Sequence, residues 1–175
     1  YRSVPHMLEE SFKKNAARPF SVCMDRWMTY GQLDDLSSAM GAWLQSQGLE
    51  PGARVAIMLP NVPQFAVTMA GILRAGYTCV NVNPLYTARE LEHQLKDSGA
   101  TTIVILENFA HTLQSVIDKT PITTVVVASM GDLLGAMYGR WITFAVRHLA
   151  KMVPAYEIPL TNGRKVVPFT EVMSK

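Results

Sequence analysis

Four short, uninterrupted apolar segments alternate with stretches of helical patterning, and this alternation limits the possible folds more than any other feature. The segments are residues 54–60 (RVAIMLP), 77–82 (YTCVNV), 101–106 (TTIVIL) and 120–129 (TPITTVVVAS). Continuous apolar runs of this length are typical of strands that are covered on both faces. Crossover helices between such strands place them parallel in one sheet. The pattern predicts an α/β fold with an open, mainly parallel sheet flanked by helices.

Capping residues and glycines mark where the intervening helices should begin and end. We predict a capping box at Thr29 and at Thr87. In this motif the side chains of a threonine and of the third residue after it each accept a hydrogen bond from the other's backbone N–H. Glycine often ends a helix because it adopts a left-handed conformation without strain. We expect helices over residues 4–16, 30–48, 63–76, 87–99 and 111–119, and a hairpin of residues 20–24 and 27–29.

Composition excludes several classes of protein. Sixteen Lys and Arg against fourteen Asp and Glu give a net charge of +2, and 17% charged residues is a low share, since about 25% is usual. This is not the composition of a disordered or nucleic-acid-binding chain. The mean hydropathy is +0.11, but the apolar runs are shorter than the roughly 18 residues of a membrane span. Cys23 and Cys79 lie in apolar runs without CxxC spacing, which predicts reduced core residues in a reducing compartment.

Motifs for self-contained catalysis or metal binding are missing from the sequence. Neither GxGxxG nor GxxxxGK[ST] occurs, and the four histidines are scattered without partners at ligand spacing. We therefore predict no catalytic residue and no metal site. Gly131, Gly135 and Gly139 have GxxxG spacing, for which a loop or frayed turn is favoured over helix pairing. The chain begins at Tyr1 and its last residues read as the start of a helix, so we expect a piece of a longer protein.

Residues 139–154 (GRWITFAVRHLAKMVP) predict a basic amphipathic helix. Between Asp132 and Glu157 the charged residues are three cations and no acid, which suits an anionic membrane surface or an acidic partner. The alternative is an ordinary helix packed on the protein, with its charged face exposed to solvent. The expected apolar stripe is Trp141, Ile142, Ala145, Leu149 and Met152, opposite Arg140, Arg147, His148 and Lys151.

The string LRAGYTCVNVNPLYTARELEHQLKDSGATTIVI resembles the second conserved motif of the acyl-adenylate-forming enzymes, and most of all their long-chain fatty acid CoA ligase branch. MTYGQLDDLSSAMGAWL and GARVAIMLPNVPQF resemble further stretches of that family. The resemblance implies activation of a fatty acid by ATP and Mg²⁺ to an acyl-adenylate, followed by transfer to coenzyme A. A medium-chain or aryl acid ligase, and a non-catalytic membrane- or partner-binding module, remain alternatives.

The resemblance also implies a division of the chain. The family's phosphate loop, its other AMP-binding motifs and its C-terminal lid domain are missing from these residues, so we expect the chain alone to be inactive. Residues 1–175 would be the N-terminal portion of the AMP-binding domain, the first subdomain of the large N-terminal domain. Residues 1–128 would form the βα-alternating core, 129–160 an amphipathic helical insertion, and 161–175 the start of the next element.

Candidate coenzyme A contacts follow from the same resemblance, whereas the membrane-surface residues follow from the basic helix. Some family members bind the nucleotide of coenzyme A across two strand ends, whereas asparagine and proline at these positions are also ordinary turn residues. The implied partners are a fatty acid, the anionic membrane surface and a second copy in a homodimer, with no nucleic acid; the implied location is the cytoplasm, peripheral on the inner membrane. No residue lining an acyl tunnel can be assigned. The expected coenzyme A contacts are Asn81, Asn83, Pro84, Asn108, Phe109 and His111, and the expected membrane-surface residues are Arg140, Trp141, Arg147 and Lys151.

Overall fold

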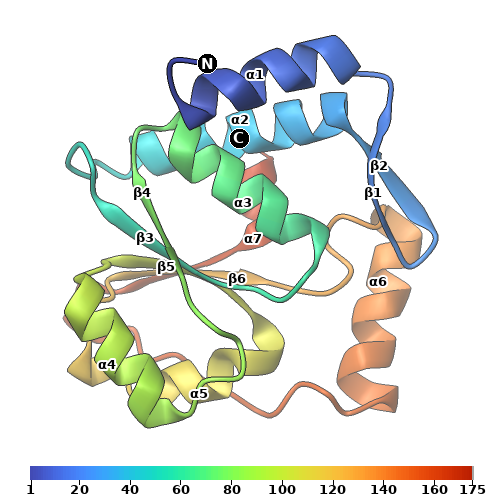
Figure 1. The fold of residues 1–175 in the computed structure, drawn as a ribbon. Coiled ribbons are helices and arrows are strands. Elements are labelled where there is room, and N and C mark those ends of the chain that lie inside the picture. Colours follow the sequence, from blue (N-terminus) through green and yellow to red (C-terminus); the bar gives the residue numbers. More distant parts are fainter. Residues whose placement is uncertain (175) are drawn as a thin grey trace.

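The computed structural model describes residues 1–174 and contains a five-stranded parallel sheet (Figure 1). The strand order is β4-β3-β5-β6-β7, and every neighbouring pair is parallel. The predicted fold class is therefore confirmed. The strands are β3 (Arg54–Met58), β4 (Thr78–Asn81), β5 (Thr102–Leu106), β6 (Thr124–Ala128) and β7 (Lys165–Pro168).

Strand β7 was not predicted from the sequence. It has only four residues, three of its side chains are exposed, and it carries Lys165 and Pro168. It lies at an edge of the sheet, where one side of the strand is unpaired and proline is tolerated. Such an edge strand lacks the continuous apolar run that identifies a covered strand.

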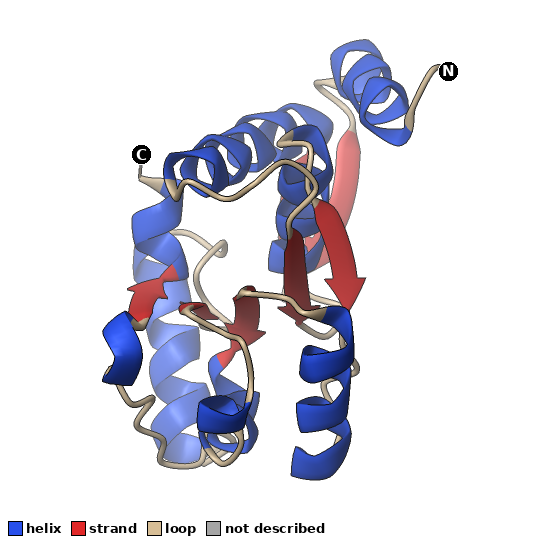
Figure 2. Cartoon of the chain, turned by 90° about the vertical axis from the view of Figure 1, so that its left-hand side faces the viewer, coloured by secondary structure: helices blue, strands red, loops and turns tan. Residues whose placement is uncertain are grey.

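Helices cover both faces of the sheet, as Figures 1 and 2 show from two directions. One face carries α1, α2, α3 and α7, and the other carries α4 and α5. The strands of a parallel sheet need this cover because both of their faces are apolar. The helices are α1 (Val4–Asn15), α2 (Tyr30–Ser46), α3 (Pro63–Arg74), α4 (Ala88–Ser98), α5 (Ala110–Gln114) and α7 (Phe169–Met173).

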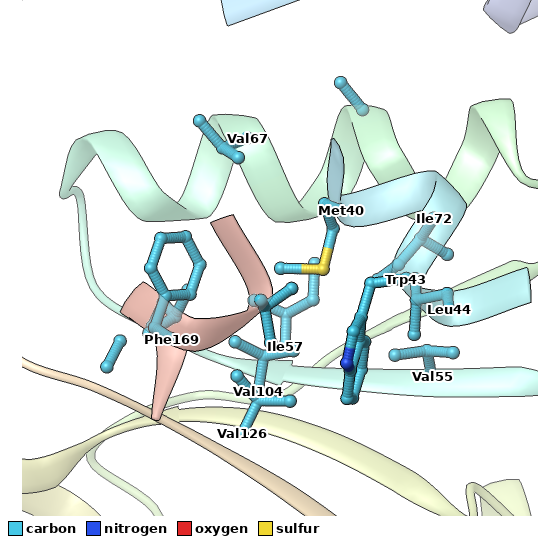
Figure 3. Packing of buried hydrophobic residues seen from close by; sticks show 14 of the residues in the cluster. Met40, Trp43, Leu44, Val55, Ile57, Val67, Ile72, Val104, Val126 and Phe169 are labelled. Carbon is cyan, nitrogen blue, oxygen red and sulfur yellow. The ribbon is translucent and has the colours of Figure 1, made fainter. Parts of the chain in front are cut away.

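The larger of the two apolar clusters lies between α2, α3 and the sheet (Figure 3). Met40 and Trp43 of α2 reach toward the strands, and both side chains are buried. A Cβ on Gly71 would come within 2.6 Å of the Cγ of Met40, so glycine lets α2 and α3 approach closely at this point. This packing supports the strands from one side.

Both capping boxes predicted from the sequence are present. The hydroxyl of Thr29 accepts a hydrogen bond from the backbone N–H of Gln32 at 3.2 Å, and Oε1 of Gln32 accepts one from the backbone N–H of Thr29 at 2.9 Å. Thr87 and Glu90 form the same arrangement at the start of α4, which ends at Gly99 in the left-handed conformation. These local signals fixed the starts of α2 and α4 correctly.

The predicted hairpin is also present. Its strands are β1 (Pro19–Cys23) and β2 (Arg26–Thr29), which pair antiparallel as a separate two-stranded sheet. The turn residues Met24 and Asp25 both have positive φ. Cys23 and Cys79 are free thiols, and each is partly buried. Cys79 packs against the larger apolar cluster, whereas Cys23 belongs to neither cluster, so the prediction of a core residue was wrong for Cys23. Burial raises the pKa of both thiols.

Two predicted helices differ in the structure. The helix expected over residues 111–119 is a 3₁₀ turn η1 (Glu107–Phe109), then the short α5, then a second 3₁₀ turn η2 (Ile117–Lys119). The basic helix expected over residues 139–154 is α6 (Ala136–Phe144) followed by a π-helical turn η3 (Ala145–Leu149). It ends early because Ala150 N–H bonds the carbonyl of Ala145 five residues back, at 2.8 Å, and Lys151 has a φ of 51°.

The three glycines with GxxxG spacing do not pair two helices. Gly131 lies in a turn, Gly135 precedes α6, and Gly139 lies inside α6. The loop interpretation is correct for the first two and wrong for the third. Gly131 and Gly139 approach so closely that a Cβ on either would clash with the carbonyl oxygen of the other. Within residues 1–174, no helix is long and apolar enough to cross a membrane.

Candidate functional site

The carboxyl edge of the parallel sheet is the part of the fold where a ligand site is expected. After β3 the chain continues into α3 on one face of the sheet, and after β5 it continues into α5 on the other face. Neighbouring strands whose connections leave to opposite faces form a crevice at their carboxyl ends. The ends of β3 and β5, which are paired in the sheet, meet this condition, and we call this place the crevice.

A cluster of polar side chains occupies this edge. We call it the edge cluster. Gln64, in the first turn of α3, is fully buried and donates through Nε2 to the backbone carbonyl of Ser129 at 2.8 Å. Glu107 follows β5 directly and is 1% exposed. The backbone N–H of Ser129 donates to Oδ2 of Asp132 at 2.7 Å. The edge cluster consists of Gln64, Glu107, Ser129, Asp132 and Arg147.

Arg147 closes the cluster from the π-helical turn η3. Its Nε donates to Oε2 of Glu107 at 2.7 Å, and its Nη2 lies 2.5 Å from the same oxygen. Nη2 also donates to the hydroxyl of Ser129 at 3.3 Å. The hydrogen bond to Glu107 raises the pKa of Arg147 above its usual value. The ion pair compensates a carboxylate that would otherwise be buried alone, which would be costly.

Asp132 has an unusual protonation equilibrium. Burial raises the pKa of this carboxyl to about 6, and the negative charge of Glu107 adds to the increase. The hydrogen bond from the Ser129 backbone and the charge of Arg147 act in the opposite direction, with smaller effect. Asp132 therefore exchanges a proton near neutral pH, which ordinary surface carboxylates do not.

Three oxygens beside this crevice accept no hydrogen bond from the described residues. They are Oε1 of Gln64, Oε1 of Glu107 and Oδ1 of Asn108. Buried acceptors are usually paired, so a site with several free acceptors suits a group that brings N–H or O–H donors. A groove of about 450 Å³ lies alongside, between the turn at Gly131, α6 and Thr170, and it is lined in part by Asp132 and Arg147.

The residues predicted to contact coenzyme A fall into two groups at the same sheet edge. Asn81 ends β4, and Asn83 and Pro84 follow it, whereas Asn108, Phe109 and His111 follow β5; β3 lies between these strands. Asn83 Oδ1 accepts from the backbone N–H of Leu85 at 3.0 Å, which is the turn role that the residue type also allows.

In the second group, Asn108 Nδ2 donates to the carbonyl of Met152 at 3.0 Å. His111 is exposed, and its ring contacts the hydroxyl of Thr112 at 3.3 Å. The segment around Met152 thus lies against the turn after β5. The assignment of both groups to coenzyme A stays a prediction.

The four residues predicted for the membrane surface do not share one environment. Arg140, Trp141 and Lys151 are exposed, and 55% of Trp141 is accessible. Arg147 is also exposed, with 44% of its side chain accessible, but unlike the other three it forms an ion pair with Glu107. An ion pair between residues 40 positions apart depends on the strand order, which the sequence pattern does not give.

The sequence interpretation missed Gln64, Glu107 and Asp132. A signal was available for Glu107, because it is the first charged residue after four consecutive apolar ones in a covered strand. Polar residues at that position of a parallel strand lie at the ligand-binding edge. Gln64 had no comparable signal, since one polar residue in the first turn of a helix is ordinary.

Among residues 1–174, no three His, Cys, Asp or Glu side chains are grouped to hold a metal ion.

Comparison with known proteins places this geometry in a wider context. Residues 8–140 match the model of the AMP-binding enzyme family. The chain is 49% identical over 160 residues, or 91% of its length, to a long-chain-fatty-acid–CoA ligase of Escherichia coli O157:H7. It is 41% identical over 175 residues to the protein of the same description from Haemophilus influenzae. The chain spans 28% and 30% of these two relatives.

Solved structures show the same fold. The anthranilate CoA ligase AuaEII, solved with anthranoyl-AMP, superposes with a TM-score of 0.74 over 99% of this chain and 28% of its own. The sequence identity in that comparison is 18%. This likeness concerns the fold of the chain.

Proposed function

Because this chain belongs to the AMP-binding enzyme family, we propose that it is the N-terminal part of an ATP-dependent long-chain fatty acid CoA ligase. The enzyme would activate a fatty acid as acyl-AMP, release pyrophosphate and transfer the acyl group to the thiol of coenzyme A. The observation that carries the proposal is the 49% identity over 91% of the chain to the Escherichia coli relative.

Within such an enzyme, this chain would serve mainly as scaffold and as one wall of the site. The sheet fixes the edge cluster, and the cluster presents acceptor oxygens and a proton-exchanging carboxyl at the crevice. Positioned groups of this kind contribute to catalysis by orienting reactants. The finer assignment of Asn81, Asn83, Pro84, Asn108, Phe109 and His111 to coenzyme A belongs to the same proposal.

ATP, Mg²⁺ and coenzyme A are the cofactors of the proposed enzyme. When bound, Mg²⁺ neutralises phosphate charge. The described residues form no group of metal-ligating side chains. We therefore assign metal and triphosphate binding to other parts of the enzyme. The cytoplasmic location, the contact with an anionic membrane and the homodimer also stand as parts of this proposal.

The similar fold of an anthranilate ligase does not favour an aryl substrate here, since 18% identity supports the fold alone. The relatives with 49% and 41% identity carry the long-chain description. Substrate class is therefore argued from the sequence relatives. A non-catalytic binding module has no comparable support.

The test is fatty-acid-dependent release of pyrophosphate by the full-length protein, offered short, medium, long and aromatic acids. We expect release with long-chain acids, and none from residues 1–175 assayed in parallel. Release only with another acid class would keep the adenylating chemistry and overturn the substrate. No release with any acid would favour the binding-module alternative.

A further inference from the structure

Large apolar side chains remain exposed along one side of α6 and the turn that follows it. Met137, Trp141 and Phe144 have the i, i+4, i+7 spacing that places side chains on one side of a helix. Single exposed apolar residues are ordinary, but a group of them on one element marks a contact surface. We call Met137, Trp141 and Phe144 the α6 outer face; Leu149, in η3, and Met152, after it, are further exposed apolar residues of the same segment.

The opposite side of α6 is fixed to the protein. Gly139 packs on Gly131, Val146 is buried, and Arg147 pairs with Glu107. The guanidinium of Arg26, from the hairpin, lies 4.8 Å from the ring centre of Tyr138. With these contacts in place, α6 cannot turn its outer face inward, and Figure 1 shows the helix standing at the side of the molecule.

The aromatic rings of the outer face contact one another along the helix. Trp141 stacks on Phe144 with ring centres 6.0 Å apart, and Phe144 contacts the ring of His148 at 4.9 Å. Rings held in place lose little conformational freedom on binding. Tryptophan is also a residue type that favours the headgroup level of a membrane.

The charges around this surface select an anionic partner. Residues 133–156 contain no Asp or Glu. Arg140 and Lys151 are exposed cations at its margins, whereas Arg147 is engaged by Glu107. An apolar aromatic strip with cations at its margins complements the headgroup boundary of a bilayer that contains acidic lipids.

We propose that the α6 outer face inserts into the headgroup boundary of an anionic bilayer. Trp141 and Phe144 supply the apolar contact, Arg140 and Lys151 lie at the level of the lipid phosphates, and Arg147 stays bound to Glu107. The inference builds on the proposed function, because it identifies where the proposed ligase meets the membrane.

The experiment measures co-sedimentation of the full-length protein with vesicles of phosphatidylserine and phosphatidylcholine, and with phosphatidylcholine alone. The main variant is Trp141→Ser with Phe144→Ser, and a second is Arg140→Glu with Lys151→Glu. The matched control is Leu85→Ser, which removes an 83% exposed leucine from the turn before α4. Each protein is also assayed for pyrophosphate release without vesicles, and for its melting temperature and its mass in solution.

We expect the aromatic variant to bind mixed vesicles about tenfold more weakly or worse, because two buried rings are lost. The charge variant should lose binding to the mixed vesicles and little to phosphatidylcholine alone, and the control should bind as the original does. Activity without vesicles should be unchanged in all three variants.

Three outcomes would overturn the inference. Unchanged vesicle binding by the aromatic variant would remove this surface from the membrane contact. A lower melting temperature with lost activity would mean that the rest of the enzyme covers the face. A change from dimer to monomer would mean that a second copy covers it. Failure of the proposed function appears separately, as absent pyrophosphate release by the unaltered protein whatever its vesicle binding.

Discussion

Glu107 and Arg147 show how single residues couple the π-helical turn η3 to the sheet. A carboxylate with 1% exposure is tolerated because a guanidinium lies against it. Arg147 itself remains 44% exposed. The ion pair therefore stabilises the fold chiefly because it leaves no uncompensated charge on the buried Glu107.

We predict that Arg147→Met lowers the free energy of unfolding by about 2 kcal/mol. The loss is smaller than for a fully buried ion pair because the side chain of Arg147 is partly exposed to solvent. Urea denaturation of the chain measures this. Adding Glu107→Gln to the variant should recover much of the loss, since the buried charge is then gone. Arg140→Met, on the exposed side of α6, serves as the control. Equal losses at the two arginines would contradict the role of the ion pair.

Asp132 should make stability depend on pH. Its pKa of about 6 in the folded chain is above its ordinary value of 3.8, so the bound proton stabilises the fold at low pH. This contribution is complete below about pH 4 and is lost as the pH rises through about 6.

We therefore predict that Asp132→Asn becomes more stable relative to the original protein as the pH rises, by about 1 to 3 kcal/mol between about pH 4 and pH 7. Asparagine still offers an oxygen to the Ser129 backbone, so the comparison isolates the charge. Urea unfolding at both pH values gives the difference. A constant difference at the two pH values would exclude the raised pKa.

At the scale of elements, local signals predicted most helices and strands. These signals act within a few residues of sequence, so they can be recognised before the fold is known. They are the capping boxes at Thr29 and Thr87 and the apolar runs of β3, β5 and β6. The π-helical turn η3 and the left-handed backbone of Lys151 could not be predicted from the sequence. The spacing of apolar residues does not indicate a hydrogen bond between residues five positions apart.

The capping box of α2 gives a direct test. Thr29→Ala should lower the free energy of unfolding by about 1 kcal/mol, since it removes the acceptor for the Gln32 N–H. Thr29→Ser keeps the hydroxyl and should lose much less. Thermal or urea unfolding of the three proteins measures both effects. If serine and alanine were equally destabilising, the hydroxyl would not be acting as a cap.

The contact between Gly131 and Gly139 gives a second test at this scale. Gly139→Ala should displace α6, because its Cβ would meet a backbone carbonyl that cannot move aside. Overpacking of this kind costs about 1 to 3 kcal/mol. Hydrogen exchange of the α6 amides should become faster, whereas Arg140→Ala in the same helix should leave it nearly unchanged. Unaltered exchange in Gly139→Ala would show that the turn adapts.

At the scale of the whole molecule, the sequence indicated the parallel sheet and the family, but not the edge cluster. The cluster requires β3, β5 and β6 to be neighbours, with β4 outside them and Arg147 brought back over the edge. These are long-range relations that local patterns do not contain. The residues expected at the strand ends did reach the same edge, because carboxyl ends of parallel strands meet there.

We propose that this sheet belongs to a ligase for long-chain fatty acids. The most direct test offers the full-length enzyme an equimolar mixture of octanoate, laurate, palmitate and benzoate, with ATP, Mg²⁺ and coenzyme A, and identifies the thioesters by mass spectrometry. We predict palmitoyl-CoA as the main product and benzoyl-CoA at background. A product dominated by octanoyl-CoA or benzoyl-CoA would contradict it.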